Sequence, residues 1–267
     1  MPDKIEAVAD QRELWRRQAE ESANCVLQAG VLLMKSGAEV YRVEETMTRL
    51  GNSIPFVQSC ESYVMVTGVI CTVQMGGQTI TSMARIHDTG RNLSVVSAVN
   101  DLSRQAERQH FTPDQILEKL AQIEETPDFT PETKALWGAI GAAGFTMFFG
   151  GNLADLVFVF VIGLIVRFFT VVCEKIHLNS YLVNMFLAFL ASVCSVLLHR
   201  HVPEASQSIM IISSIMLLVP GLTITNALRD SVMDEPLSAL VLLMQALLCA
   251  CAIAIGVLIG LFMTGAM

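Results

Sequence analysis

The chain has 267 residues, of which 53% are apolar and 16% are charged, and its formal net charge is −8. The charges are unevenly divided, because residues 1–134 contain 13 Lys and Arg against 19 Asp and Glu, whereas residues 135–267 contain only 4 against 6. An acidic chain without a cluster of basic residues is unsuited to nucleic acid, whose phosphates require such a cluster. We therefore predict an acidic cytosolic domain, residues 1–134, followed by a membrane domain, residues 135–267.

The N-terminus and the cysteines both indicate a cytosolic setting for the first domain. Residues 1–18 carry many charges and lack the apolar core of a cleavable signal peptide. The 7 cysteines are scattered without a C-x-x-C pair, so neither a zinc site nor a disulfide framework is expected. We predict reduced, buried cysteines, no metal, no cofactor, and an N-terminus on the cytosolic side of the membrane.

Helices in the first domain are predicted from their apolar spacing and from the residues at their ends. Gly51-Asn52 is an end signal, whereas Thr112-Pro113 and Thr130-Pro131 are start signals with a hydroxyl cap and a proline in the first turn. The predicted helices span residues 10–33, 39–50, 93–109 and 112–123, and a further helix starts at residue 130 and enters the membrane.

A β-hairpin is predicted between the second and third helices. Residues 62–74 are rich in β-branched side chains, and Gly76-Gly77 separates them from a second strand, 78–86. With at least these two strands, the first domain belongs to the α+β class.

The second domain is predicted to be an all-α bundle of five transmembrane helices. A bilayer core of about 30 Å requires about 20 mostly apolar residues in a helix. Five segments are candidates, although residues 135–151 are short and residues 206–219 are too short to span untilted. An odd number of spans places the two termini on opposite sides of the membrane. The predicted spans are residues 135–151, 153–172, 181–199, 206–219 and 237–263.

The positive charges near these spans predict their orientation. With a cytosolic N-terminus, four basic residues fall at or near the cytosolic face, and only Arg200 falls outside. The four are Lys134, Arg167, Lys175 and Arg229. The bias agrees with the absence of a signal peptide.

Gly256 and Gly260 form a G-x-x-x-G pattern in the fifth predicted span. Such a pattern lets two helix backbones approach closely. Packing within the chain and contact with another membrane subunit both remain open interpretations.

The fourth predicted span is interrupted at Pro220-Gly221, which predicts a functional break. A broken helix exposes backbone groups that lipid cannot satisfy, so the break must face protein or water, as at the substrate sites of transporters. The adjacent polar residues can hydrogen-bond a small solute, and Arg229 can pair with a carboxylate. The predicted substrate-binding residues are Pro220, Gly221, Thr223, Thr225, Asn226 and Arg229. The alternative is a plain exit from the membrane, with residues 222–232 lying along the cytosolic surface.

Several ionisable residues form a second group of candidates. Glu39, Glu44 and Glu45 could act as acids or bind a metal, or simply form a solvated helix face. His87-Asp88 could be a catalytic pair or a surface turn. The chain has no Walker A motif, which argues against an ATP-driven pump.

Three ionisable or polar residues lie in or beside predicted spans, where such groups are functional candidates. Asp155 is at the turn after the first span, Arg167 is in the second span, and Asn184 is in the third. Arg167 could instead extend its charge to the cytosolic headgroups. With the four residues of the first domain, the possible gating or cytosolic site comprises Glu39, Glu44, His87, Asp88, Arg167 and Asn184.

Three segments resemble the threonine/serine exporter family in the same order along the chain. They are GAEVYRVEETMTRLG (37–51), RIHDTGRNLSVVSAVNDLSRQ (85–105) and LLVPGLTITNALRD (217–230). The likeness extends from about residue 20 to the end of the chain, and the three segments together are more specific than any one alone. The positions that match the family's motifs are Gly37, Glu39, Glu44, Asp88, Gly90, Pro220, Gly221 and Asn226.

The resemblance implies a non-enzymatic exporter of small carboxylate metabolites in the cytoplasmic (inner) membrane. The chain resembles the half-length type, such as the larger subunit of the two-subunit succinate exporter, so a second, smaller membrane subunit or a homo-oligomer is the expected partner. A succinate-type dicarboxylate and threonine or serine remain open as substrates. The alternative function is a membrane-anchored hydrolase or a sensor that uses the cytosolic Glu, His and Asp residues.

Overall fold

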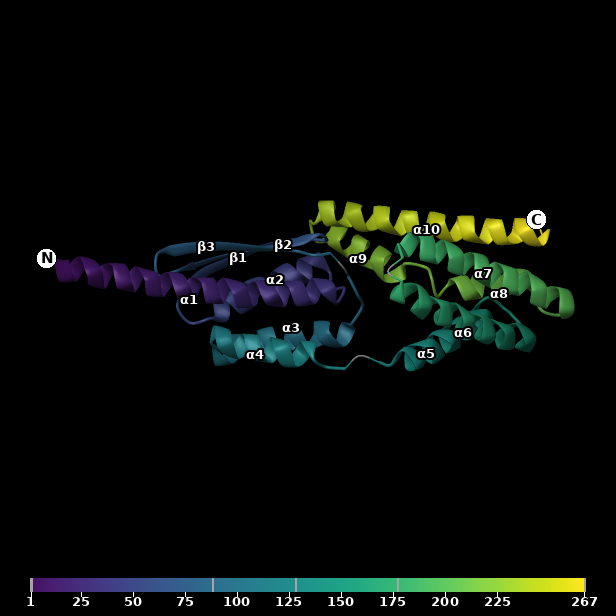
Figure 1. Cartoon of the computed structure of the whole chain (residues 1–267), viewed down its shortest axis with the longest axis horizontal. Coiled ribbons are helices and arrows are strands. Elements are labelled where there is room, and N and C mark those ends of the chain that lie inside the picture. Colours follow the sequence, from purple (N-terminus) through teal and green to yellow (C-terminus); the bar gives the residue numbers. More distant parts are fainter. Residues whose placement is uncertain (1, 88, 128, 177, 267) are drawn as a thin grey trace. The chain divides into compact units, whose positions relative to one another are not determined.

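The computed structural model describes residues 2–87, 89–127, 129–176 and 178–266, apart from the side chains of residues 2–9 and 174. This part of the chain is mostly helical, with ten helices and one three-stranded sheet (Figure 1). It divides into two compact units. Unit 1 comprises Met1–Asp128 and Asn226–Leu242, and unit 2 comprises Phe129–Thr225 and Leu243–Met267.

The helices of unit 1 begin where their capping residues are. α4 (Pro113–Glu124) starts with a complete capping box, in which the Thr112 hydroxyl accepts from the Gln115 N–H and the Gln115 side chain accepts from the Thr112 N–H. The predicted start of this helix is therefore confirmed. The other helices of the first 128 residues are α1 (Pro2–Lys35), α2 (Val40–Ser53) and α3 (Leu93–Gln109).

α2 continues through Gly51-Asn52, so the predicted helix end there is wrong. Gly51 is required for packing, because a Cβ at this position would lie 2.2 Å from Sγ of Cys60. The Asn52 side chain accepts a hydrogen bond from the Cys60 N–H at 2.9 Å. Both residues thus serve the contact of α2 with the neighbouring strand instead of terminating the helix.

The sheet has three antiparallel strands in the order β1 (Val57–Met65), β2 (Gly68–Met75) and β3 (Gln78–Arg85). Gly76 and Gly77 join β2 to β3 with φ values of 56° and 76°, the left-handed conformation that a two-residue type I′ turn requires. The predicted hairpin is confirmed.

The prediction of one strand over residues 62–74 is wrong, because a turn divides this segment. Met65 pairs with Gly68, and Val66 and Thr67 form the turn between β1 and β2. These two residues have high strand propensity, so the composition conceals the turn.

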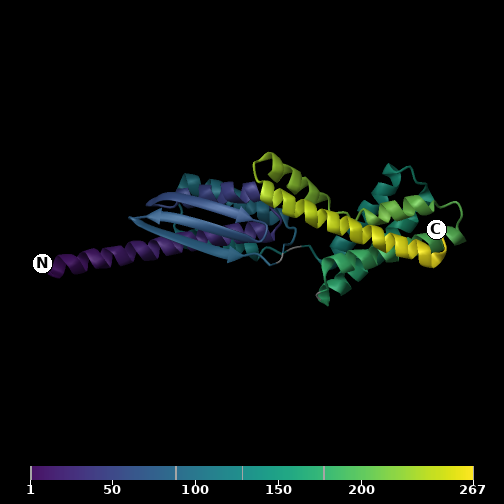
Figure 2. The ribbon, with the colours of Figure 1, turned by 90° about the horizontal axis from the view of Figure 1, so that it is seen from above.

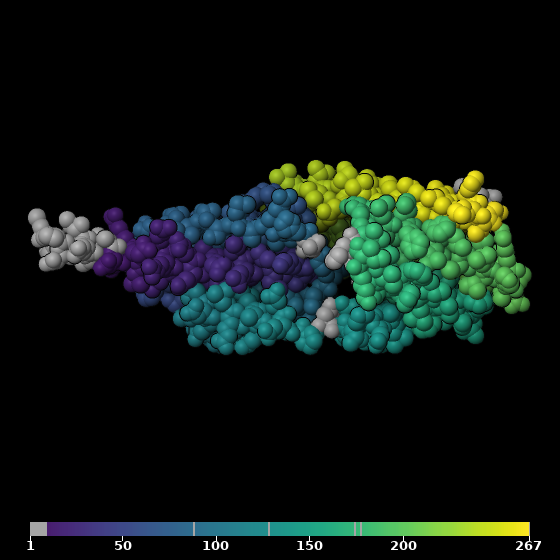
Figure 3. All heavy atoms as spheres, viewed as in Figure 1, coloured from purple at the N-terminus to yellow at the C-terminus, as the bar shows by residue number. Residues whose placement is uncertain are grey.

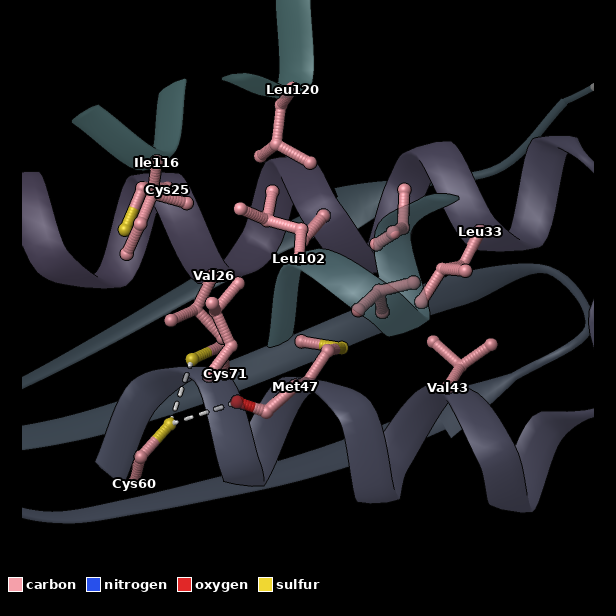
Figure 4. Close-up of a cluster of buried hydrophobic side chains, with 14 of the residues drawn as sticks. Cys25, Val26, Leu33, Val43, Met47, Cys60, Cys71, Leu102, Ile116 and Leu120 are labelled. Atoms are coloured by element: carbon pink, nitrogen blue, oxygen red, sulfur yellow. Dashed lines mark hydrogen bonds between the residues drawn. The ribbon is translucent and has the colours of Figure 1, made fainter. Parts of the chain in front are cut away.

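The core of unit 1 lies between the sheet and the helices. α1 and α2 cover one face of the sheet, and α3 and α4 pack on the other side of these two helices (Figure 1 and Figure 2). β2 buries alternate residues, including Val69, Cys71 and Val73, as expected for a strand with one face in the core. Figure 4 shows Val26 and Met47 packed in the same cluster.

The cysteines of this core, Cys25, Cys60 and Cys71, are free thiols and are buried. Sγ of Cys60 lies 3.8 Å from Sγ of Cys71 (Figure 4). The hydrogen bond to Cys71, together with burial, raises the pKa of the Cys60 thiol, and burial raises the pKa of Cys25 to about 12. Thiols with raised pKa values are poor nucleophiles and poor metal ligands at neutral pH.

Three helices of the described chain are long and apolar enough to cross a membrane. The candidate spans are Leu153–Cys173 in α6 (Leu153–Lys175), Ser180–His201, which is α7, and Pro236–Thr264, which is α10. The other two predicted spans correspond to α5 (Pro131–Phe148) and α8 (Gln207–Ile215).

The fourth predicted span is shorter than expected. α8 ends at Ile215 instead of Val219, and its 9 residues extend about 14 Å, roughly half the thickness of a bilayer core. α9 (Gly221–Val232) follows after a short non-helical segment. The predicted interruption at Pro220-Gly221 is therefore present, and it separates two short helices.

In unit 2, the G-x-x-x-G pattern packs α10 against α7. Figure 3 shows the yellow atoms of α10 lying against green atoms that precede it in the chain. A Cβ at Gly256 would lie 2.1 Å from the carbonyl oxygen of Met185, and a Cβ at Gly260 would lie 1.8 Å from Oγ of Ser192. The Ser192 hydroxyl also donates to the carbonyl oxygen of Val257 at 3.4 Å. The pattern thus serves packing within the chain, which was the first of its two interpretations.

This close approach predicts that Gly256→Ala destabilises the protein by about 1–3 kcal/mol, because α10 must move away from the backbone of α7. Gly144→Ala in α5 is the matched control, since its Cβ would meet no atom within 4 Å. Unfolding of the purified protein in detergent measures both changes. Equal stability of the two variants would contradict the packing described here.

Candidate functional site

The turn between α1 and α2 brings together two of the three segments that resemble the exporter family. Gly37 ends α1 with φ of 83°, which favours glycine. The Gly90 N–H donates to the carbonyl oxygen of Lys35 at 2.7 Å, and the Asn92 N–H donates to that of Ser36 at 3.0 Å. A Cβ at residue 37 would lie 2.8 Å from the Gly90 carbonyl oxygen, so this contact also requires glycine.

The third segment, in α9, binds the same turn. The Asn226 side chain donates to the carbonyl oxygen of Gly37 at 3.3 Å, and Nη1 of Arg229 lies 2.5 Å from Oε1 of Glu39. Glu39 also faces Arg42, whose Nε is 3.6 Å from the second carboxylate oxygen. The Glu39 side chain is only 10% exposed, and a carboxylate that is so buried requires cationic partners. The two guanidinium groups provide this compensation. We call Gly37, Glu39, Gly90, Asn226 and Arg229 the turn site.

Asp230 adds a second buried carboxylate beside the turn site. Its side chain is fully buried, and its carboxylate faces the N–H groups of Tyr41 and Val40 at the start of α2. Burial raises the pKa of Asp230, and the charges of Glu39 and Glu235 add to this effect. The N–H groups of Tyr41 and Val40 oppose it, and the resulting pKa is about 6. The helix N-terminus thus compensates the charge only partly.

Glu44 lies one turn further along α2, near the same carboxylates. Its Oε1 accepts a hydrogen bond from the Val64 N–H at 2.7 Å. Burial raises the pKa of Glu44, and the nearby carboxylates of Glu235 and Asp230 raise it further, against the lowering effect of the Val64 N–H. Glu45 instead forms an ion pair with Arg49 on the exposed face of the helix.

The predicted His87–Asp88 pair gives no site that can be described. His87 is exposed, and Asp88 lies outside the described residues. Among the described residues, no group of three or more His, Cys, Asp or Glu side chains could hold a metal ion.

The four remaining predicted substrate residues lie at the helix break in unit 2. Pro220 is buried, Thr223 is half-buried, and the Thr225 hydroxyl donates to the carbonyl oxygen of Gly221 at 2.9 Å. A cavity of about 500 Å³ borders the break, and its lining is apolar. The lining residues are Ile215, Val219, Pro220, Ile224, Ala250, Ile253, Ala254, Val257 and Leu258.

The break is partly satisfied by the protein itself. The Cys249 thiol contacts the carbonyl oxygen of Leu218 at 3.8 Å, and Asn184 donates to the same sulfur at 3.2 Å. Asn184 therefore links α7 to α10 at the level of the break. This pairing meets the requirement that backbone groups freed inside a membrane find partners.

Two charged residues of unit 2 have different environments. The Arg167 side chain packs over Gly138, and a Cβ added to Gly138 would lie 3.4 Å from the Cγ and Cδ atoms of Arg167. The Nε atom of Arg167 is buried without a hydrogen-bond partner among the described residues. Asp155 is buried and accepts from the N–H groups of Asn152 at 2.9 Å and Ser206 at 2.6 Å. Asp155 therefore fastens two loops of this unit together.

The sequence predictions missed two residues that the structure adds to the candidate site. Asp230 follows Arg229 directly within a matching segment, which was the available signal for it. Glu235 lies in the connection between α9 and α10, where no local pattern distinguished it from a solvated loop residue.

Comparison with known proteins identifies the family. The chain matches the family model described as "Putative threonine/serine exporter" over residues 24–264, and it therefore belongs to this family. It is similar to the "Probable succinate transporter subunit YjjP" of Escherichia coli (strain K12), with 28% identity over 206 residues that cover 76% of this chain and 79% of the relative.

A second relative extends the likeness over more of the chain. The protein of the same name from Klebsiella aerogenes is 26% identical over 241 residues, which cover 90% of this chain and 92% of the relative. No solved structure matches the chain. Family membership and the three apolar helices support a membrane transporter.

The Glu39–Arg229 pair is expected to stabilise unit 1. A double-mutant cycle with Glu39→Gln and Arg229→Gln should give a coupling of about 1 kcal/mol, because one partner is buried. Glu20→Gln and Arg16→Gln provide an exposed control pair with an expected coupling of about 0.3 kcal/mol. Equilibrium unfolding of the full chain measures both cycles, and equal couplings would contradict a special role for the turn site.

Asp230→Asn should raise the melting temperature at pH 7.5, because the ionised carboxylate is buried without full compensation. The folded-state pKa of about 6 lies above the ordinary value of 3.8, so the native state takes up a proton as the pH falls through 6. The advantage of the variant should therefore shrink between pH 7 and pH 4. Asp101→Asn, at an exposed position in α3, is the control and should show no such trend.

Proposed function

We propose that the protein is a secondary exporter of small carboxylate metabolites across the cytoplasmic membrane. In this proposal residues 1–134 form a cytosolic domain and residues 135–267 lie in the membrane, with α6, α7 and α10 as full spans. α5 and α8 are shorter membrane-embedded helices that complete the five predicted membrane segments. The family, the three apolar helices and the excess of positive charge on the predicted cytosolic side support this arrangement.

The observation that carries the proposal is the ion pair between Glu39 and Arg229. The guanidinium of Arg229, which we expected to bind a carboxylate of the substrate, is paired with the carboxylate of Glu39. Arg229 is 54% exposed along its side chain, so a small acid from the cytosol can reach it. We propose that the substrate carboxylate replaces Glu39 at Arg229, which exchanges one charge-assisted pair for another at little net cost.

Exchange at this position would release α9 from the turn site. Asn226 and Arg229 both hold α9 to the segment between α1 and α2, so losing one contact weakens the attachment. α9 is the second half of the broken helix, and discontinuous helices move in alternating access. The substrate would thereby open its own path from the cytosol.

The relatives' printed name describes a succinate transporter subunit. On this basis we propose a dicarboxylate of the succinate type ahead of threonine or serine, and a second membrane subunit as partner. The hydrolase alternative draws no support from the described residues, because Glu39 is paired with two arginines and His87 is exposed on the surface.

Arg229→Ala should reduce succinate export at least about tenfold, because the substrate loses a charge-assisted hydrogen bond. Glu39→Gln should act in the opposite direction and lower the internal concentration that gives half-maximal export, because it removes the competing carboxylate. Efflux of labelled succinate from loaded cells, with the partner subunit co-expressed, measures both.

Arg104→Ala on the exposed surface of α3 is the control for loss of a positive charge. Immunoblots of isolated membranes establish that all variants insert. Undiminished export by Arg229→Ala, or weaker export at low internal concentration by Glu39→Gln, would refute the exchange of carboxylates at Arg229.

A further inference from the structure

The two edges of the sheet in unit 1 differ in how their main chain is covered. β1 is one edge, and side chains of α2 accept hydrogen bonds from it. The Asn52 side chain accepts from the Cys60 N–H at 2.9 Å. The Glu44 carboxylate accepts from the Val64 N–H at 2.7 Å. The register of β1 is also irregular near its start, and both features hinder the pairing of β1 with another strand.

β3 is the other edge, and it has neither feature. Its register with β2 runs without a shift from Gln78 to Arg85, and it contains no proline and no charged residue before Arg85. Among the described residues, β2 is the only element whose main chain pairs with β3 (Figure 2). A long, regular edge strand of this kind is a template for a further strand unless charges, a proline or a bulge prevent it.

The hydrogen bonds around β3 show which of its main-chain groups are free. The Ile86 N–H, directly after β3, donates to the carbonyl oxygen of Thr67, directly before β2, at 3.0 Å. Successive residues of a strand direct their main-chain groups to opposite sides, so the even-numbered residues of β3 face β2. The two-residue turn before Gln78 requires the same orientation of that residue. The residues that direct their main-chain groups to the free edge are therefore Thr79, Thr81, Met83 and Arg85.

These groups are complementary to those of a second copy of the same strand. Two antiparallel copies of β3 can be related by a two-fold axis at Ser82. Thr81 then lies opposite Met83 of the second copy, and Thr79 lies opposite Arg85 of the second copy. All the outward N–H and C=O groups of both strands find partners in this register. Like charges do not face each other, because each arginine is opposite a threonine.

The side chains of β3 also suit this pairing. We call the face of the sheet that α1 and α2 leave uncovered the open face. Met83 projects from it and is 73% exposed, more than any other large apolar residue of the described sheet. In the two-fold register, the two copies of Met83 are diagonal neighbours beside the axis, within reach of each other. The pairing would therefore cover an exposed apolar side chain at its centre and place polar residues at its ends.

We propose that β3 pairs with β3 of a second copy of this chain and joins the two three-stranded sheets into one. This contact is separate from the second membrane subunit proposed above, so either can fail without the other. A single strand pair is smaller than the interface of about 1,600 Å² that is typical of stable complexes. The pairing is therefore best tested in the membrane, where the copies are concentrated.

Disulfide cross-linking tests the register in isolated membranes. Thr81→Cys and Met83→Cys copies of the full chain, each with its own tag, are co-expressed and oxidised mildly. Residues opposite each other in a hydrogen-bonded pair have Cα atoms about 5.5 Å apart, which suits a disulfide. A linked product that carries both tags is expected. Thr81→Cys with Glu61→Cys, an exposed position of β1 on the open face, should give none, and the parent chain controls for the native cysteines.

A charge reversal tests the contact independently of the disulfide position. In the cross-linking pair, Thr79→Lys should slow the reaction and Thr79→Glu should accelerate it, with initial rates at least about threefold apart, because residue 79 faces Arg85 of the second copy. Within one chain these residues are too far apart along β3 for such an effect. The same substitutions at Ser59, on the distant strand β1, should give equal rates.

Three results would overturn the proposal. The first is the absence of the product that carries both tags, or an equal yield with Glu61→Cys. The second is the same change of rate for Thr79→Lys and Thr79→Glu. The third is a disulfide between Thr81→Cys and a different protein in place of the second copy. Immunoblots of the membranes establish that every variant inserts.

Discussion

The attachment of α9 to the turn between α1 and α2 depends on the compensation of one buried carboxylate, that of Glu39. A carboxylate with so little exposure needs cationic partners. Arg42 of α2 and Arg229 of α9 are these partners. Because Arg229 lies 190 residues further along the chain, this requirement attaches residues 226–232 to the first 128 residues within unit 1. Gly37 and Gly90 make the contact feasible by allowing the backbone segments to approach.

The same region contains carboxylates that are not compensated. Asp230, Glu44 and Glu235 lie near one another, and the pKa values of Asp230 and Glu44 are raised by burial and by the neighbouring charges. A fold that was selected for stability alone would replace such residues by apolar ones of similar size.

A different constraint applies to the apolar helices of unit 2, because backbone groups inside a membrane need hydrogen-bond partners within the protein. The small residues Gly256 and Gly260 bring α10 against α7, and Asn184 with Cys249 provides polar contacts at the level of the helix break. The cavity at Pro220 is apolar.

The sequence by itself determined the features that depend on neighbouring residues. The cap at Thr112, the hairpin at Gly76-Gly77 and the break at Pro220 follow from local backbone and hydrogen-bond chemistry. Only the tertiary structure decided that Glu39 receives Arg229 and that Asp230 is buried, because burial and ion pairing depend on segments distant in the chain. For the same reason the role of Gly51, which makes room for Cys60, could not be distinguished from that of a helix terminator.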